Sequence, residues 1–205
     1  MSDNLYIKNL FIKCICEFIQ VFKFYFLGFI FLFLFSNTFL FSFDTSAKSA
    51  ILYDETTNSV LFEKFADKPL PPASMSKLMT LLLTFEALEE KRISLSTKFR
   101  VSEKASKKGG STMFLEKSQL VSVEDLIKGI SVVSGNDACI VIAEGLNGTE
   151  ESFVERMNLK AKDLGLLNSN FNNSTGWPSP GHYMSVRDLL TIATILKNKY
   201  PNYYK

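Results

Sequence analysis

The chain has 205 residues, enough to form a hydrophobic core, and its formal net charge of +2 is only a small positive excess. No basic block occurs, so we expect no nucleic-acid partner. The single histidine, and the lack of C-x-x-C and H-E-x-x-H motifs, argue against a metal site, and we expect no cofactor.

The first 46 residues predict a targeting or membrane segment. Phenylalanine crowds there, and the stretch from Phe24 to Phe43 contains no charged residue. Lysines precede this stretch, in the order of a secretory signal peptide, although it is also long enough to span a bilayer if it is not cleaved. The pattern favours a signal peptide over a retained inner-membrane anchor. In both cases we expect residues 47–205 to be secreted to the periplasm or cell envelope.

The first elements after this segment are a hairpin and a helix. Ala50–Tyr53 and Val60–Phe62 are short apolar runs on either side of a polar turn, which predicts a β-hairpin. A proline-rich bend follows. The next segment, Ser74 to Glu90, is apolar on nearly every face, which predicts a central, buried helix.

The rest of the chain predicts helices and loops. Helices are expected from a capping box at Ser122 through Ile130, over Asp137–Leu146, over Glu150–Leu164, and from a cap at Ser185 to Leu196. The stretch Asn172–His182 is predicted to be a loop. A two-stranded sheet with open edges would remain, which suggests that further strands belong to this fold.

Ser74-Met75-Ser76-Lys77 is an S-x-x-K sequence at the start of the buried helix. Residues three apart share a helical face, so the Ser74 hydroxyl and the Lys77 amine can meet. A serine hydroxyl needs an adjacent base to become a nucleophile, and burial together with the helix dipole favours an uncharged lysine. The non-catalytic alternative is a serine that caps the helix, followed by an ordinary helix lysine.

A second candidate is Ser134-Gly135-Asn136, which places a hydroxyl and an amide on one tight loop. Alone it is ordinary turn chemistry. In this order and spacing, however, the two motifs resemble those of the active-site serine family that includes penicillin-binding proteins and class A β-lactamases. The segments Pro72–Thr80, Gly109–Leu115 and Val133–Ala138 are most similar to serine D-alanyl-D-alanine carboxypeptidases, and the likeness extends over about residues 47–200.

The resemblance implies roles for four residues. Ser74 would be the nucleophile, Lys77 its general base, and Ser134 the proton relay to the leaving amine. Asn136 would bind substrate and orient Lys77. The implied reaction removes the terminal D-alanine of a peptidoglycan stem peptide through an acyl-enzyme, and β-lactams would acylate Ser74 in the same way. The E-x-E-L-N element of class A β-lactamases is absent, so efficient β-lactam hydrolysis is not expected.

The resemblance also implies an α+β, β-lactamase/transpeptidase-like fold, of which residues 47–205 would form the helical lobe and the N-terminal hairpin. The family's third motif, K-T-G, occurs nowhere in the sequence, and its strand and the later sheet strands are expected to be missing. Ser174-Thr175-Gly176 lacks the required cation. The alternative function is therefore a catalytically inactive, truncated fragment.

Three further residues are interpreted as structural. His182 lies in the predicted loop and no G-x-S-x-G motif accompanies it, so it is not expected to belong to a catalytic triad. Cys139 is expected to be a small buried residue. Ser76 is expected to point away from the face of Lys77 and to help the helix begin.

Overall fold

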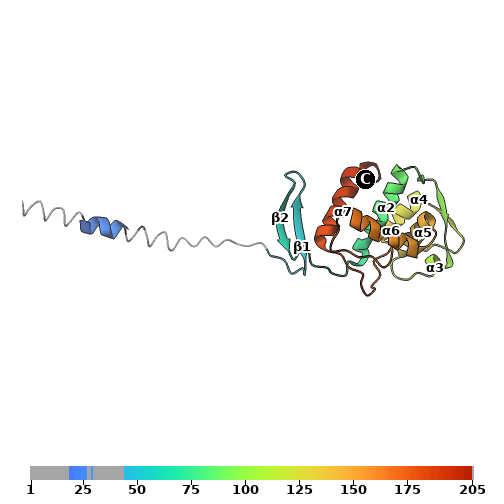
Figure 1. Ribbon diagram of the computed structural model, residues 1–205, viewed down its shortest axis with the longest axis horizontal. Helices are drawn as coiled ribbons and strands as arrows, with labels where there is room; N and C mark the ends of the chain where they lie inside the picture. Colours follow the sequence, from blue (N-terminus) through green and yellow to red (C-terminus); the bar gives the residue numbers. More distant parts are fainter. Residues whose placement is uncertain (1–18, 27–28, 30–43, 205) are drawn as a thin grey trace, which may run out of the picture. The chain divides into compact units, whose positions relative to one another are not determined.

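The computed structural model describes residues 19–26, 29 and 44–204 (Figure 1). The chain divides into two compact units, Met1–Asp44 and Thr45–Lys205. Residues 19–26 are helical, and no helix in the described ranges combines the length and apolar character needed to cross a membrane. Most of the predicted signal or anchor segment lies outside the described residues, so the following concerns the second unit.

The predicted hairpin is confirmed. Strand β1 (Ala50–Asp54) pairs with β2 (Ser59–Lys64) in antiparallel register. The turn between them is closed by the carboxylate of Asp54, which accepts hydrogen bonds from the backbone N–H of Thr56 at 2.8 Å and the hydroxyl of Thr57 at 2.6 Å. The hairpin contacts helix α7, beside which Figure 1 shows it.

The expectation of a single sheet was wrong. A second two-stranded antiparallel sheet joins β3 (Lys98–Arg100) to β4 (Leu120–Ser122), with Phe99 opposite Val121. Each strand has three residues, too few for alternation of apolar and polar side chains to be visible in sequence. The pairing joins segments about twenty residues apart, so it depends on the tertiary fold.

Helices make up most of the remaining unit. The predicted helices after the hairpin are confirmed, with ends that differ from expectation by a few residues. The elements are η1 (Ala73–Ser76), α2 (Lys77–Glu89), α3 (Glu103–Ser106), α4 (Val123–Val133), α5 (Asn136–Asn147), α6 (Glu150–Asp163), α7 (Val186–Lys199) and α8 (Pro201–Tyr204).

Helix α2 is the central element, as predicted. Most of its residues are buried, and it packs against α4, α5, α6 and α7. Its start differs from expectation, because Ala73–Ser76 form a 3-10 turn and the α-helix begins only at Lys77. Ala73 has a φ of 49°, in the left-handed region that non-glycine residues avoid. The nucleophile candidate therefore lies on a tight turn that precedes the α-helix.

Side-chain caps begin the later helices. The hydroxyls of Ser122 and Ser185 accept hydrogen bonds from the backbone N–H of Asp125 and Asp188, each at 3.1 Å, which confirms both predicted caps. Ser102 and Thr149 cap α3 and α6 in the same way. These caps satisfy backbone donors that have no partner within the helix.

The Ser122 cap gives a direct test of this fold. We expect Ser122→Ala to lower the free energy of unfolding by about 1 kcal/mol, because the Asp125 N–H loses its acceptor. Denaturant unfolding of the full chain measures the change. Ser131→Ala, at an exposed site within α4, is the matched control and should change stability by less than about 0.5 kcal/mol. Equal effects of the two substitutions would contradict the capping role.

Candidate active site

Ser74 and Lys77 meet at the N-terminal end of the central helix, as the sequence predicted. The Nζ atom of Lys77 lies 3.1 Å from the Oγ atom of Ser74. Ser74 is exposed on turn η1, whereas Lys77 is only 4% exposed. An accessible hydroxyl thus lies beside a buried amine, the arrangement that a serine nucleophile with a lysine base requires.

The surroundings of Lys77 favour its uncharged form. Burial lowers the pKa of its amine below the ordinary value of 10.5. The buried Cys139 acts in the opposite direction, and the positive charge of Lys108 lowers the pKa further. A lower pKa increases the fraction of amine that can accept a proton near neutral pH.

The second partner of Lys77 is a backbone atom that no motif had indicated. Its Nζ donates a hydrogen bond of 2.8 Å to the carbonyl oxygen of Thr175. By its side chains, Ser174-Thr175-Gly176 lacks the cation of K-T-G and gives no indication of a contact with Lys77. Because a carbonyl belongs to every residue, the sequence holds no signal for this contact.

Asn173 shapes the turn that presents this carbonyl. Its side-chain Oδ1 accepts hydrogen bonds from the backbone N–H groups of Thr175 at 3.1 Å, Gly176 at 2.8 Å and Trp177 at 3.0 Å. Asparagine commonly bonds to the backbone just after it and so forms such turns. The concentration of Asn, Ser, Gly and Pro in this stretch predicted a loop, but not the direction of its Thr175 carbonyl toward Lys77.

Helices α2 and α6 both hold the residue before Thr175. Ser174 donates its N–H and its hydroxyl to Glu150 Oε1, at 3.0 and 2.8 Å, and the Thr80 hydroxyl donates to the Ser174 carbonyl at 2.7 Å. Burial acts to raise the pKa of Glu150, but Lys104 and the Ser174 donors outweigh it and hold the pKa below its ordinary value. The ionised carboxylate therefore remains available to fix Ser174.

Ser134 lines the same cavity as Ser74 and Lys77. It follows α4 with a φ of 56°, and among residues 19–26, 29 and 44–204 its buried Oγ has no hydrogen-bond partner. The cavity has a volume of about 490 Å³, and apolar side chains from α2, α4 and α7 complete its wall. A buried hydroxyl without a partner in the wall of this cavity can be satisfied by a bound molecule.

Asn136 begins α5 and is 6% exposed. Its side-chain amide donates to the Gly109 carbonyl at 2.9 Å, and its backbone N–H donates to the Ser111 carbonyl at 2.7 Å. These bonds join the second motif to the glycine loop. The hydrogen bonds of Lys77 go to Ser74 and Thr175, so the predicted roles of Asn136 in binding substrate and orienting Lys77 remain predictions.

The glycine loop closes against Trp177. A Cβ atom at Gly110 would lie 2.8 Å from the Asn136 amide nitrogen and 2.9 Å from the Trp177 ring, so a side chain at this position would collide with both. Lys108 lies over the face of the same ring, 4.5 Å from its centroid, in a cation–π contact. Trp177 therefore lies between the glycine loop and the loop that carries Thr175, in contact with Lys108 and close to Gly110.

The three residues interpreted as structural have different outcomes. His182 is buried and bonds to Ser76, so the structure agrees with the structural interpretation. Cys139 is buried as predicted, and burial raises the pKa of its thiol to about 12. Ser76 is the N-cap residue of α2, at the start of the helix as expected, but its side chain makes no capping hydrogen bond and its hydroxyl instead bonds to His182.

In the part of the chain that the structure describes, no three His, Cys, Asp or Glu side chains are grouped to hold a metal ion. The site places a hydroxyl, a buried amine and a second hydroxyl around one cavity. That set is suited to nucleophilic acyl transfer.

The family model and two relatives that match this chain are D-alanyl-D-alanine carboxypeptidases. A family model described as D-alanyl-D-alanine carboxypeptidase matches residues 37–205. The D-alanyl-D-alanine carboxypeptidase DacF of Bacillus subtilis (strain 168) is 48% identical over 147 residues, which cover 72% of this chain and 38% of the relative. DacC of Escherichia coli (strain K12) is 38% identical over 164 residues, which cover 77% of this chain and 41% of the relative.

Solved structures share the fold. The D-alanyl-D-alanine carboxypeptidase DacD of Francisella tularensis superposes with a TM-score of 0.78 at 34% identity, covering 80% of this chain and 40% of that one. Penicillin-binding protein D2 of Listeria monocytogenes, in its ampicillin-bound form, gives a TM-score of 0.69 at 28% identity, covering 78% and 65%. The fold is thus the predicted α+β transpeptidase-like architecture.

The chain spans about two fifths of the length of the curated relatives described here. Within that span, the family match, the shared fold and the Ser74–Lys77 geometry agree. The chain belongs to the D-alanyl-D-alanine carboxypeptidase family, peptidase family S11.

Proposed function

We propose that this chain carries the nucleophile and general base of a serine D-alanyl-D-alanine carboxypeptidase. The observation that supports this most directly is the 3.1 Å approach of the exposed Ser74 hydroxyl to the buried Lys77 amine, beside a cavity that Ser134 also lines. The substrate would be a peptidoglycan stem peptide that ends in two D-alanines. The site of action would be the cell envelope.

The reaction would proceed in two steps. Neutral Lys77 takes the hydroxyl proton of Ser74 as its Oγ bonds to the carbonyl carbon of the penultimate D-alanine. The C–N bond to the last D-alanine then breaks, and the leaving nitrogen receives a proton through Ser134. Water hydrolyses the resulting ester and restores Ser74. A β-lactam would acylate Ser74 by the same attack, with its ring amide in place of the peptide bond.

The contacts around Lys77 support its role as the base. The Thr175 carbonyl accepts one of its N–H groups at 2.8 Å, which fixes the nitrogen beside Ser74. A neutral amine held in this way has a lone pair left to receive the serine proton. Burial of Lys77 also supports this role, because it excludes the water that would otherwise stabilise the charged ammonium form.

The alternative is a chain that keeps this geometry but does not turn over substrate. The sequence contains no K-T-G, and removal of even one group that stabilises the oxyanion typically lowers the rate by about 10²–10³. The two functions differ in a measurable way, because only a competent site forms a covalent acyl-enzyme.

Acylation of Ser74 can be tested with a fluorescent penicillin. We expect weak or no labelling of the chain alone. A chimera in which this chain replaces the matching segment of Bacillus subtilis DacF should label strongly, because the remaining family elements are then supplied. In the chimera, Ser74→Ala should abolish labelling, while Ser96→Ala, at an exposed serine, should leave it unchanged.

Labelling of the Ser74→Ala chimera as strong as that of the parent would reject Ser74 as the nucleophile. A folded chimera that never labels would favour the inactive alternative. Strong labelling of the chain alone would contradict the expected need for the third motif.

The role of Lys77 predicts a specific pH dependence. Since only the neutral amine accepts the proton, the acylation rate of the chimera should rise as pH increases through the lowered pKa of Lys77 and then level off. Removing the like charge in Lys108→Met should move this inflection to higher pH.

A substitution that removes the base at Lys77 should lower the acylation rate. Lys77→Arg keeps a cation that cannot be deprotonated, so acylation should fall by about 10²–10⁴. Lys107→Arg, at an exposed lysine, is the control and should retain the parent rate. A rate that Lys77→Arg leaves unaltered would exclude Lys77 as the base.

A further inference from the structure

The turn that carries Ser74 contains a strained backbone conformation and has no side-chain capping hydrogen bond. Ala73, the residue before the nucleophile, has a φ of 49°. Neither η1 nor α2 begins with a side-chain cap, in contrast to α4, α6 and α7. A non-glycine residue in this region persists only when surrounding contacts hold it.

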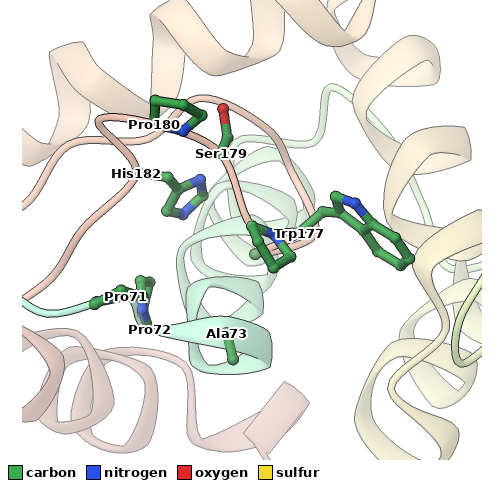
Figure 2. A pocket seen from close by; sticks show the side chains of 9 residues that line it. Pro71, Pro72, Ala73, Trp177, Ser179, Pro180 and His182 are labelled. Carbon is green, nitrogen blue, oxygen red and sulfur yellow. The ribbon is translucent and has the colours of Figure 1, made fainter.

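The loop opposite contacts this turn at particular points and leaves a hollow beside it. A hollow of about 350 Å³ separates Pro71 and Pro72 from the loop at 176–182. Figure 2 shows the hollow with His182 on one side and Trp177 on the other. Gly176 does reach the turn, since a Cβ there would lie 1.8 Å from the Ala73 carbonyl oxygen, so the two backbones are in direct contact.

The second contact is a hydrogen bond between His182 and Ser76. The Nε2 atom of His182 lies 2.7 Å from the Oγ atom of Ser76, and both side chains are buried. The other ring nitrogen, Nδ1, accepts the backbone N–H of Asn172 at 3.3 Å. Because Nδ1 is an acceptor, the hydrogen of the neutral ring resides on Nε2, and His182 donates to Ser76.

The same loop therefore contacts two adjacent residues, Ser76 and Lys77, that follow the nucleophile. Its Thr175 carbonyl accepts from Lys77 at 2.8 Å, and its His182 ring donates to Ser76 at 2.7 Å. Ser76 immediately precedes Lys77, so a shift of Ser76 changes the direction in which the Lys77 side chain leaves the backbone. The two bonds together fix the distance between loop and turn.

We propose that the His182–Ser76 hydrogen bond positions the Ser74–Lys77 pair, so that both Ser76 and His182 are positioning residues for acylation. The proposal rests on the proposed function. Neither residue touches the reacting atoms. Each acts by keeping the turn and the loop together, so that Lys77 retains its Thr175 acceptor and its distance from Ser74.

The first test uses the full chain and needs no activity. The sequence has one histidine, so a sample with ¹⁵N-labelled histidine gives ring signals from His182 alone. We expect the Nε2–H tautomer in the parent chain. Titration of the Lys77 side chain by NMR should show a depressed pKa in the parent. In Ser76→Ala this pKa should move toward its ordinary value, as the amine gains access to water.

The second test measures acylation by a fluorescent penicillin in the DacF chimera. Displacement of catalytic groups by about 1 Å lowers rates by on the order of 10²-fold, and we expect a loss of this order for Ser76→Ala. Ser76→Thr keeps the hydroxyl and should restore both the rate and the Lys77 pKa. Ser76→Cys, which keeps the volume of the side chain, should behave like Ser76→Ala and replaces it if that variant does not fold.

The outcomes separate this proposal from the proposed function. A parent chimera that is not acylated would reject the proposed function, while the tautomer and the Lys77 titration would still test the positioning. A Ser76→Ala variant with lower thermal stability but the parent Lys77 pKa and parent acylation rate would show a merely structural bond and overturn the proposal. An Nδ1–H tautomer would overturn it as well.

Discussion

The structure of this site depends on one buried amine. A lysine within an apolar helix is unfavourable if it stays charged and unpaired, and Lys77 avoids this through burial that favours the neutral form and through two nearby oxygen atoms. One of these belongs to Ser74 and the other is the Thr175 carbonyl. The same placement that makes the lysine tolerable in the core also makes it a base for the adjacent hydroxyl.

The loop at 171–182 is the second determinant of the site. Four kinds of contact fix it: the Asn173 turn, the Ser174 bonds to α2 and α6, the Gly176 approach to Ala73, and the His182 ring. Asn158 adds a further restraint by exchanging two hydrogen bonds with the backbone of Phe171. A loop held at so many points acts as a rigid wall, which is what a preorganised nucleophile requires.

The family assignment and the local geometry agree, but they rest on different observations. The relatives establish the family and the fold, over a span that is about two fifths of their length. The contacts of Lys77, Ser134 and His182 are properties of this chain. They link the family motifs to specific atoms, and it is at those atoms that the chemistry can be tested.

By itself, the sequence determined the hairpin, the buried central helix, the capped helices and the meeting of Ser74 with Lys77, because all of these follow from spacing within a few residues. The tertiary structure alone decided the second sheet, the Thr175 carbonyl contact and the His182–Ser76 bond. The physical reason is the separation along the sequence between the residues that make contact. Helical spacing is local, whereas a backbone carbonyl or a ring nitrogen about a hundred residues away is brought to its partner only by the packing of the whole unit.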